Sequence, residues 1–363
     1  MRVLVAMDSF KGSMSSLEAG NAVKTGILEA CPDAEVTVLP LADGGEGTVD
    51  AIAPYINGIT KEIPVTGPLG SPIRTDYILE ESGKTAYIEM AKASGLTLIN
   101  SEDRNPYITT TYGTGELIKD AISNGAERLV ICIGGSATND GGAGMLQALG
   151  AGFTDKDGNP IPSGAIGLRD LANADFSKLN GKDLDITVAS DVSNPLCGSN
   201  GASHVYGPQK GATYEMAEEM DHWLENYARL LGFDPFEKGT GAAGGLSFAL
   251  KNILGAKIRS GAEIVTEITG AEEAISGCNI VITGEGRMDS QTINGKAPFR
   301  IMKLAQKYNK SVLGFTGMLG DGYEECLKAG FKKIIPLTVP SMDTDKAIKS
   351  LAETARLAFE EYK

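Results

Sequence analysis

The sequence predicts an α/β protein in which both ends of the chain build one parallel-sheet domain and the middle forms an inserted mixed α/β domain. Short, continuously apolar segments near both termini are followed by polar loops and helical patterns, which is typical of parallel strands buried on both sheet faces. Residues 65–90 instead show short alternating runs broken by turn residues, which favours antiparallel hairpins. A length of 363 residues is enough for two domains.

The N-terminal part of the parallel domain begins with an apolar strand at residues 2–7. A helix is expected after the next loop, because Ser15 and Glu18 have the spacing of a capping box and an apolar side continues to about Ala30. A second strand at residues 35–41 leads into another loop and helix.

The C-terminal part of the chain returns to the same alternation. Strands are expected at 279–283, 311–316 and 332–338. Helices are expected at 297–308, 321–330 and 344–362. We therefore place the parallel domain at 1–63 and 264–363, and the inserted domain at 64–263. A simple division into an N-terminal and a C-terminal half is the alternative.

The composition limits the class of protein. A net charge of −14 and the absence of a Lys/Arg cluster argue against a nucleic-acid partner. No apolar run approaches the roughly 20 residues of a membrane span. Asp8 interrupts the first apolar segment too early for a signal peptide, so a cytoplasmic location is expected. The negative field would repel an anionic substrate, so an anion site needs local donors.

Cysteine and histidine give little support to metal or disulfide chemistry. Five scattered cysteines without a CxxC pair predict neither a zinc site nor a disulfide framework, and Cys132 and Cys278 are expected to be buried thiols. His222 lies in a helical pattern and is expected to be structural, whereas the role of His204 stays open.

The strongest candidate loop is "ICIGGSATNDGGAGM", in which glycines follow an apolar strand directly. Such a junction brings backbone N–H groups close to a phosphate at a helix N-terminus. The candidate ligand-binding residues are Gly134, Gly135, Ser136, Asn139 and Asp140. A tight turn with close helix–sheet packing is the alternative, but it does not require so many polar side chains in one loop.

A second loop follows the first strand. Lys11 would neutralise a phosphate or carboxylate, and Asp8, Ser9 and Ser13 would contact it. A surface lysine beside helix-capping serines is the competing interpretation.

Two further strand ends combine glycines with acidic side chains. "LADGGEGT" contains Asp43 and Glu46, which suit a magnesium–phosphate site or a favourable helix N-terminus equally well. "VITGEGRMDSQTINGKAP" interleaves carboxylates with cations, as polyphosphate–metal sites do, although a solvated loop is possible. Its candidates are Glu285, Arg287, Asp289 and Lys296.

A general base is expected in "VASDVSNPLCG". Asp191 follows a strand-like segment and would orient or deprotonate a hydroxyl, unless it only caps the turn before Pro195. Lys210 in "VYGPQKGA" adds a cation. The P-loop, protein-kinase and GxSxG motifs are absent, and residues 239–244 match GxGxxG without a preceding strand.

Taken in order, these segments resemble the bacterial glycerate kinase family, type-1 group. The resemblance rests on "MDSFKGS", "LADGGEGT", "GTGEL", "IGGSATNDGGAGM", "ASDVSNPL", "GAAGGL", "TGEGRMDSQT" and the glycine, lysine and proline at 295, 296 and 298. It implies a Rossmann-like domain assembled from both termini, an inserted domain, and an active site in the cleft between them. It also implies ATP-dependent phosphorylation of D-glycerate to a phosphoglycerate, with Mg²⁺.

The roles of individual residues follow from the needs of phosphoryl transfer, which are positioning and charge stabilisation. Glycine backbones with Lys11, Arg287 or Lys296 would hold phosphates and the substrate carboxylate. The acidic residues at 43, 46, 285 and 289 would place Mg²⁺, and Asp191 would orient the accepting hydroxyl. A nicotinamide-dependent oxidoreductase of hydroxy acids and a non-catalytic metabolite-binding regulator are the alternatives.

Overall fold

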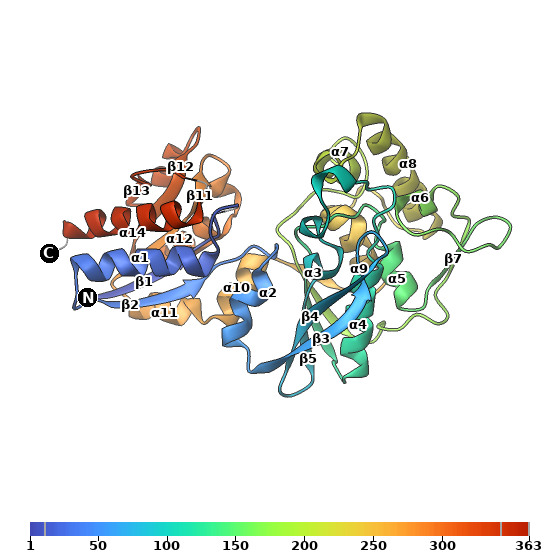
Figure 1. Ribbon diagram of the computed structural model, residues 1–363, viewed down its shortest axis with the longest axis horizontal. Helices are drawn as coiled ribbons and strands as arrows, with labels where there is room; N and C mark the ends of the chain where they lie inside the picture. Colours follow the sequence, from blue (N-terminus) through green and yellow to red (C-terminus); the bar gives the residue numbers. More distant parts are fainter. Residues whose placement is uncertain (11, 342, 362–363) are drawn as a thin grey trace. The chain divides into compact units, whose positions relative to one another are not determined.

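The computed structural model describes residues 1–10, 12–341 and 343–361, which form two compact units (Figure 1). The first unit contains residues 1–43, 50–55 and 262–363. The second contains residues 44–49 and 56–261. The chain is therefore an α/β protein with one unit assembled from both termini, as the sequence predicts.

The first unit is built on a five-stranded parallel sheet in the order β13-β12-β11-β1-β2. Its strands are β1 (Arg2–Met7), β2 (Glu35–Pro40), β11 (Ile280–Met288), β12 (Ser311–Leu319) and β13 (Lys333–Pro336). Its helices are α1 (Ser16–Ala30), α11 (Ala271–Gly277), α12 (Ala297–Lys307), α13 (Glu324–Ala329) and α14 (Thr344–Glu360). Two helices, α2 (Thr48–Ile52) and α10 (Gly261–Ile268), lie where the chain passes between the units.

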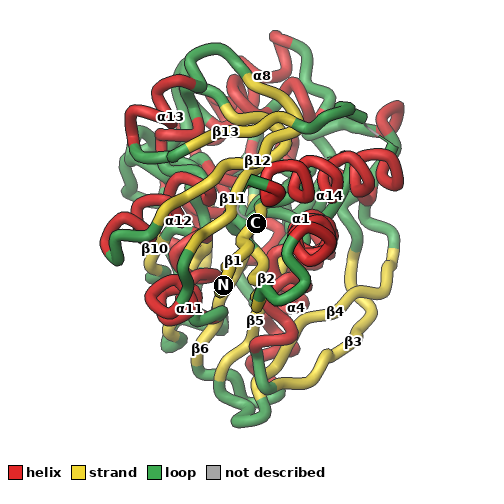
Figure 2. Tube along the Cα trace, turned by 90° about the vertical axis from the view of Figure 1, so that its left-hand side faces the viewer, coloured by secondary structure: helices red, strands yellow, loops and turns green. Residues whose placement is uncertain are grey.

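Helices cover both faces of this sheet (Figure 2). α1 and α14 pack on one face, with Val5, Ile27 and Leu351 in their shared core. α11 and α12 pack on the other face, around Leu4 and Ile301. The capping box predicted at the start of α1 is confirmed, because Ser15 N donates to Glu18 Oε2 and Glu18 N donates to Ser15 Oγ.

The contact between α1 and α14 depends on Gly26. A Cβ atom at this position would overlap the carbonyl oxygen of Ala352 in α14, which is backbone and cannot rotate away. We expect Gly26→Ala to lower the free energy of unfolding of the first unit by about 1–3 kcal/mol, as overpacking does in cores. Urea unfolding followed by circular dichroism measures this loss.

Gly277→Ala is the matched control for Gly26→Ala. Gly277 ends α11 in the same unit, and a Cβ there meets nothing within 4 Å. This control should be neutral or slightly stabilising. The only tryptophan, Trp223, is buried in the second unit, so its fluorescence transition should not move in either variant. Equal stability of the two variants would contradict the role given to Gly26.

The second unit contains a six-stranded mixed sheet in the order β10-β9-β6-β5-β4-β3. β5, β6, β9 and β10 run parallel, whereas β3, β4 and β5 form the predicted antiparallel hairpins. The strands are β3 (Gly58–Thr66), β4 (Pro72–Glu80), β5 (Thr85–Glu89), β6 (Arg128–Cys132), β9 (Asp185–Ala189) and β10 (Lys257–Arg259). A separate hairpin consists of β7 (Gly152–Thr154) and β8 (Asn173–Asp175).

Helices surround a single core in this unit, which includes Leu117, Ile131 and Leu224. The helices are α3 (Ala91–Ser94), α4 (Tyr112–Ser123), α5 (Ala143–Ala148), α6 (Ala165–Leu168), α7 (Ala202–Tyr206), α8 (Tyr214–Leu230) and α9 (Leu246–Asn252). A short 3₁₀ helix, η4 (Pro208–Lys210), follows α7 and brings a lysine to the sheet edge discussed below.

Two details of the fold differ from the sequence-based expectation. Residues 56–63 belong to the second unit, because β3 pairs with β4 along its whole length. Residues 44–49, a loop and the first two residues of α2, also belong to the second unit.

All five cysteines are free thiols. Within the described part of the chain, no helix has both the length and the apolarity to cross a membrane.

Candidate active site

The first unit gathers predicted site residues at the switch point of its sheet. β1 lies between β2 and β11 in the sheet. The chain passes from β1 to β2 on one side, and the later strands β11, β12 and β13 follow one another on the other side. Ligands of open α/β sheets bind outside the carboxyl ends of the strands at such a point. Asp8 follows β1 there, and its N–H donates to the carbonyl of Gly284 in β11 at 2.8 Å.

The residues around Glu285 lie on a strand and not in the loop that we expected. β11 continues to Met288 because β12 pairs with it beyond the end of β1. Gly284 is required because a Cβ at this position would overlap the carbonyl oxygen of Phe315 on β12, and no turn is involved. The strand therefore holds Glu285 in a fixed position past the end of β1.

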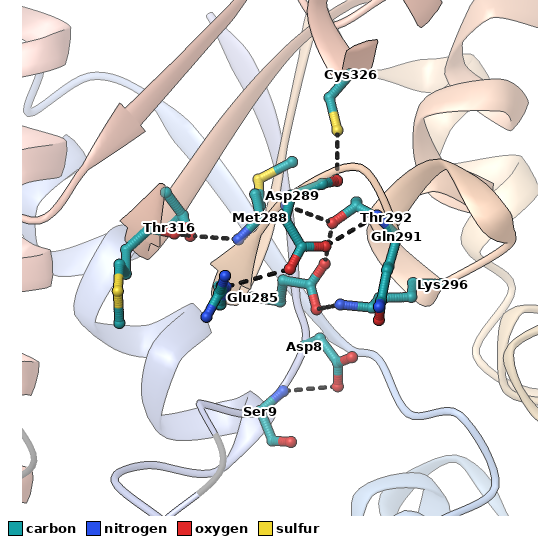
Figure 3. A network of polar contacts seen from close by, with 12 residues as sticks. Asp8, Ser9, Glu285, Met288, Asp289, Gln291, Thr292, Lys296, Thr316 and Cys326 are labelled. Carbon is teal, nitrogen blue, oxygen red and sulfur yellow. Dashed lines mark hydrogen bonds and ion pairs between the residues drawn. The ribbon is translucent and has the colours of Figure 1, made fainter. Parts of the chain in front are cut away.

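Glu285 is the central carboxylate of this group (Figure 3). Its side chain is only 10% exposed. Oε1 accepts a hydrogen bond from Thr292 Oγ1 at 2.8 Å, and Oε2 accepts one from Lys296 Nζ at 2.9 Å. The lysine neutralises the carboxylate that burial would otherwise penalise. Sequence reasoning named Glu285 and Lys296 but missed Thr292.

Asp289 forms the other half of the group. Its Oδ1 accepts from the backbone N–H of Gln291 at 2.9 Å, and its Oδ2 lies 3.2 Å from Arg287 Nε. Its own N–H donates to Thr292 Oγ1, so Thr292 joins Asp289 to Glu285 (Figure 3). The structure thus brings together the four residues predicted from this segment.

The other residues predicted in the first unit surround the same strand ends less tightly. Asp8 Oδ1 accepts from the N–H of Ser9 at 2.7 Å (Figure 3). Asp43 follows β2, and the carbonyl of Ser13 accepts from Thr344 Oγ1. Lys11 lies outside the described residues.

In the second unit, three adjacent parallel strands end at the same sheet edge, and each is followed by polar residues. β5 ends at Glu89, β6 leads into the glycine-rich loop at 133–142, and β9 leads to Asp191. The segment 44–47 lies over these strand ends, because Gly134 N donates to the carbonyl of Gly44 at 3.0 Å.

Glu89 fixes segment 44–47 in place. It is a fully buried carboxylate whose oxygens accept from Gly47 N at 2.8 Å and from Val49 N at 3.1 Å. Sequence reasoning missed it, although an acidic residue that ends an apolar strand is a signal that could have found it. Because Glu89 binds the backbone of Gly47 and Val49, the neighbouring Glu46 belongs to the second unit. There, Thr97 Oγ1 donates to Oε1 of Glu46 at 3.1 Å.

The glycine-rich loop exposes its tip at Gly134 and Gly135. Gly135 has a φ of 79°, which favours glycine, and a Cβ on Gly134 would lie 2.5 Å from Gly45 Cα. Ser136 follows with 7% of its surface exposed. The loop therefore uses the backbone freedom of glycine at Gly135 and its lack of a side chain at Gly134, which lets Gly45 approach closely. Both glycines lie at the sheet edge where a ligand can reach the chain.

Asp140 and Asn139 are held inside the protein, which corrects our expectation that they bind the ligand. Asp140 is 0% exposed, and its carboxylate accepts from Thr111 N and Oγ1, Gly142 N and Gly144 N. Burial raises the pKa of Asp140, and these four hydrogen bonds oppose the rise. Asn139 is also buried and donates to Ser203 Oγ. Both side chains support the loop, and Asp140 occupies N–H groups at the start of α5 that we expected a phosphate to use.

Lys210 is a buried lysine behind the same loop. It is 1% exposed, and its Nζ donates to Ser136 Oγ at 2.8 Å and to the carbonyl of Thr138 at 2.7 Å. Burial lowers the pKa of Lys210 to about 7, although the charge of Asp140 acts in the opposite direction. The sequence placed Lys210 in the region of Asp191, whereas the structure connects it with Ser136 and places its ammonium group beneath the glycine-rich loop.

The lowered pKa of Lys210 predicts a pH-dependent stability. The ordinary value is 10.5, so between pH 7 and 10.5 the unfolded chain binds more protons than the folded chain and stability rises with pH. Relative to Lys210→Met, the wild-type free energy of unfolding should rise by up to about 1.4 kcal/mol per pH unit above pH 7. Urea unfolding at pH 7 and pH 9, followed by Trp223 fluorescence, measures this. A difference that stays constant with pH would contradict it.

Asp191 lies in the coil after β9, at the same sheet edge as the glycine-rich loop, and is exposed.

His204 lies beside two acidic side chains. Its Nε2 atom is 3.8 Å from Glu218 Oε1 and 4.0 Å from Asp221 Oδ2, and its ring is largely covered. Within the described residues, no cluster of three or more His, Cys, Asp or Glu side chains is arranged to hold a metal ion.

Each unit ends its parallel strands in a polar edge, the first with the pairs Glu285–Lys296 and Asp289–Arg287 and the second with a glycine-rich loop. This arrangement is typical of α/β enzymes that bind small charged molecules. The model of the glycerate kinase family matches residues 3–362. Glycerate 2-kinase of Escherichia coli K12 is 49% identical over 88% of this chain and 86% of its own length. Glycerate kinase of Bacillus subtilis 168 is 45% identical over 98% of this chain and 96% of its own length.

The similarity extends to a solved structure. A crystal structure from Salmonella typhimurium LT2, assigned as glycerate kinase 2, superposes with a TM-score of 0.85 at 44% identity, covering 100% of this chain and 98% of that one. The chain belongs to the glycerate kinase family, and it is therefore a kinase.

Proposed function

We propose that this kinase transfers the γ-phosphoryl group of ATP to the 2-hydroxyl of D-glycerate, giving 2-phosphoglycerate and ADP. The observation that carries the proposal is the match to the glycerate kinase family over residues 3–362. The 2-hydroxyl is favoured over the 3-hydroxyl because a relative at 49% identity is named Glycerate 2-kinase.

Each unit, taken by itself, supplies cations or backbone donors for an anionic reactant in this proposal. Lys296 and Arg287 already hold carboxylates at the edge of the first sheet, and a phosphate would compete for the same cations. Gly135 is the exposed tip of the loop in the second unit, with Gly134 half-buried and Ser136 buried beside it. Lys11 is proposed as a further phosphate contact from its place in the sequence.

The carboxylates of the first unit suit a nucleotide-bound Mg²⁺. Mg²⁺ prefers oxygen ligands and usually takes one or two carboxylates together with substrate phosphates. Glu285 and Asp289 provide such oxygens, with Asp8 and Asp43 at neighbouring strand ends. When bound, the metal would neutralise charge on the transferred phosphoryl group.

Asp191 orients the accepting hydroxyl and takes up its proton. A carboxylate at a strand end can accept a hydrogen bond from the hydroxyl, which aligns its oxygen for attack on phosphorus. Its exposed position after β9 leaves it accessible to a small acid. Ser136 lies on the loop after the neighbouring strand β6.

Phosphorus NMR of a reaction with MgATP and D-glycerate tests the proposal. We expect ADP and one new phosphomonoester signal, whose proton coupling identifies the carbon that carries the phosphate. The 3-phosphate isomer would overturn the regiochemistry. Binding of D-glycerate or ATP without ADP formation would instead support a non-catalytic binding protein.

A further inference from the structure

The contact between Lys210 and Ser136 joins a buried cation to a serine beside the exposed tip of the loop in the second unit. The two residues are 74 positions apart in the sequence, and Nζ lies 2.8 Å from Oγ. Gly135, next to Ser136, is exposed, whereas Lys210 is almost completely buried. Ser136 is itself only 7% exposed and adjoins this exposed tip, so a ligand at Gly135 lies beside the serine, and the lysine lies beneath it.

The direction of this hydrogen bond follows from the chemistry of the ammonium group. While it is protonated, Lys210 has three N–H donors and no acceptor, so the oxygen of Ser136 accepts from it, which is the direction of the contact in the structure. The second contact, to the carbonyl of Thr138 at 2.7 Å, fixes the position of Nζ. The hydroxyl hydrogen of Ser136 then points away from Lys210 and is free to donate to another group.

The positive charge behind Ser136 is only partly balanced. Asp140 is the residue whose charge acts on Lys210, and its carboxylate already accepts four hydrogen bonds from Thr111, Gly142 and Gly144. A buried charge is stabilised most by an opposite charge that lies nearby and is itself shielded from water. An anionic oxygen of a ligand, placed against Ser136, would be such an opposite charge for Lys210.

We propose that Lys210 is a positioning residue that turns the hydroxyl of Ser136 into a dedicated hydrogen-bond donor for an anionic oxygen of the ligand. That oxygen belongs to a carboxylate or to a phosphate. The inference rests on the proposed function only for the identity of the two ligands, D-glycerate and the nucleotide. In this proposal Lys210 acts through Ser136 and does not contact the ligand directly.

A double-mutant cycle tests whether Lys210 acts through Ser136. Ser136→Ala, Lys210→Met and the double variant are compared for kcat and for the KM of each substrate. We expect each single variant to raise the KM of the same substrate about 10- to 100-fold, the range of a hydrogen bond to a charged group. The double variant should be no worse than the poorer single variant, because the second change removes a contact already lost. Lys251→Met, which removes a lysine paired with Glu237 in the same unit, should leave KM unchanged.

The substrate affected identifies the anionic oxygen. A rise in the KM of D-glycerate assigns the carboxylate, and a rise in that of ATP assigns a phosphate. Multiplicative effects of the two substitutions, or a Ser136→Ala variant with both KM values unchanged, would overturn the proposal. If Lys210→Met fails to fold, the KM values of Ser136→Ala alone decide. This variant removes only one oxygen atom, so we expect it to fold.

A binding measurement separates this inference from the proposed function. The thermal midpoint of the wild type should rise with D-glycerate alone or ADP alone, and Ser136→Ala should lose one of these two shifts. Loss of the shift supports the inference even where no phosphorylated product forms, in which case only the proposed function fails. Equal shifts in both proteins, or no shift of the wild type with either probe, would overturn the inference.

Discussion

Asp191→Asn is expected to lower kcat with ATP and D-glycerate by about 10²- to 10⁴-fold, the range that positioned acid–base groups contribute. Asparagine keeps the shape of the side chain but has no negative charge and accepts no proton. Asp191 is exposed in the coil after β9, so the stability of the second unit should change by less than about 0.5 kcal/mol. An assay coupled to ADP release measures the rate, and Trp223 fluorescence in urea measures the stability.

Asp185→Asn is the matched control for this prediction. Asp185 is an exposed aspartate at the opposite, amino-terminal end of the same strand, where it pairs with Lys257 at 3.1 Å. Its replacement should leave kcat unchanged, because surface ion pairs contribute little. A turnover of Asp191→Asn within a few-fold of the wild type would remove Asp191 from the proposed mechanism.

The parallel sheet of the first unit could be predicted because the local sequence of its strands is sufficient to identify them. Residues 3–7 and 280–282 are uninterrupted apolar runs, and both are buried on two faces, as such runs require. The extension of β11 to Met288 could not be predicted. "GEGR" has low strand propensity, and only the partner β12 makes it a strand, so tertiary pairing overrides the local preference.

The candidate site was predictable to the extent that strand ends attract polar residues. Glu285 and Ser136 were singled out because each follows an apolar segment, and Lys296 because it lies in the same charged segment as Glu285; their roles in binding stay predictions. The burial of Asp140 was not predictable, since an aspartate in a glycine-rich loop has the same local pattern whether it faces a ligand or the protein interior. Its partner Thr111 lies 29 residues earlier in the chain, and only the fold brings the two together.

Asp140 illustrates how such a loop is stabilised from within. Four N–H or O–H donors converge on its carboxylate, and they come from both the start of α4 and the turn before α5. These donors would be unsatisfied and buried without an acceptor, which is costly in a core. The carboxylate therefore holds the loop in the shape that presents Gly135 and Ser136.

Asp140→Asn is expected to lower the free energy of unfolding of the second unit by about 3 kcal/mol or more. The amide keeps one acceptor oxygen, but its NH₂ group faces N–H donors, and the charge that opposes the burial cost of Lys210 is lost. Urea unfolding followed by Trp223 fluorescence measures the loss, because this tryptophan lies in the core of the same unit.

Asp155→Asn separates the effect of burial from that of hydrogen bonding. Asp155 also accepts backbone N–H groups, from Asp157 and Asn159, but these hydrogen bonds are open to solvent in the turn after β7, where Asp155 is only half-buried. Water can replace its lost contacts, so this control should cost less than about 1 kcal/mol. If both variants lose the same stability, the buried carboxylate of Asp140 has no special role. A large loss for Asp140→Asn alone would show that a residue with the sequence pattern of a ligand contact acts instead as the internal support of the loop.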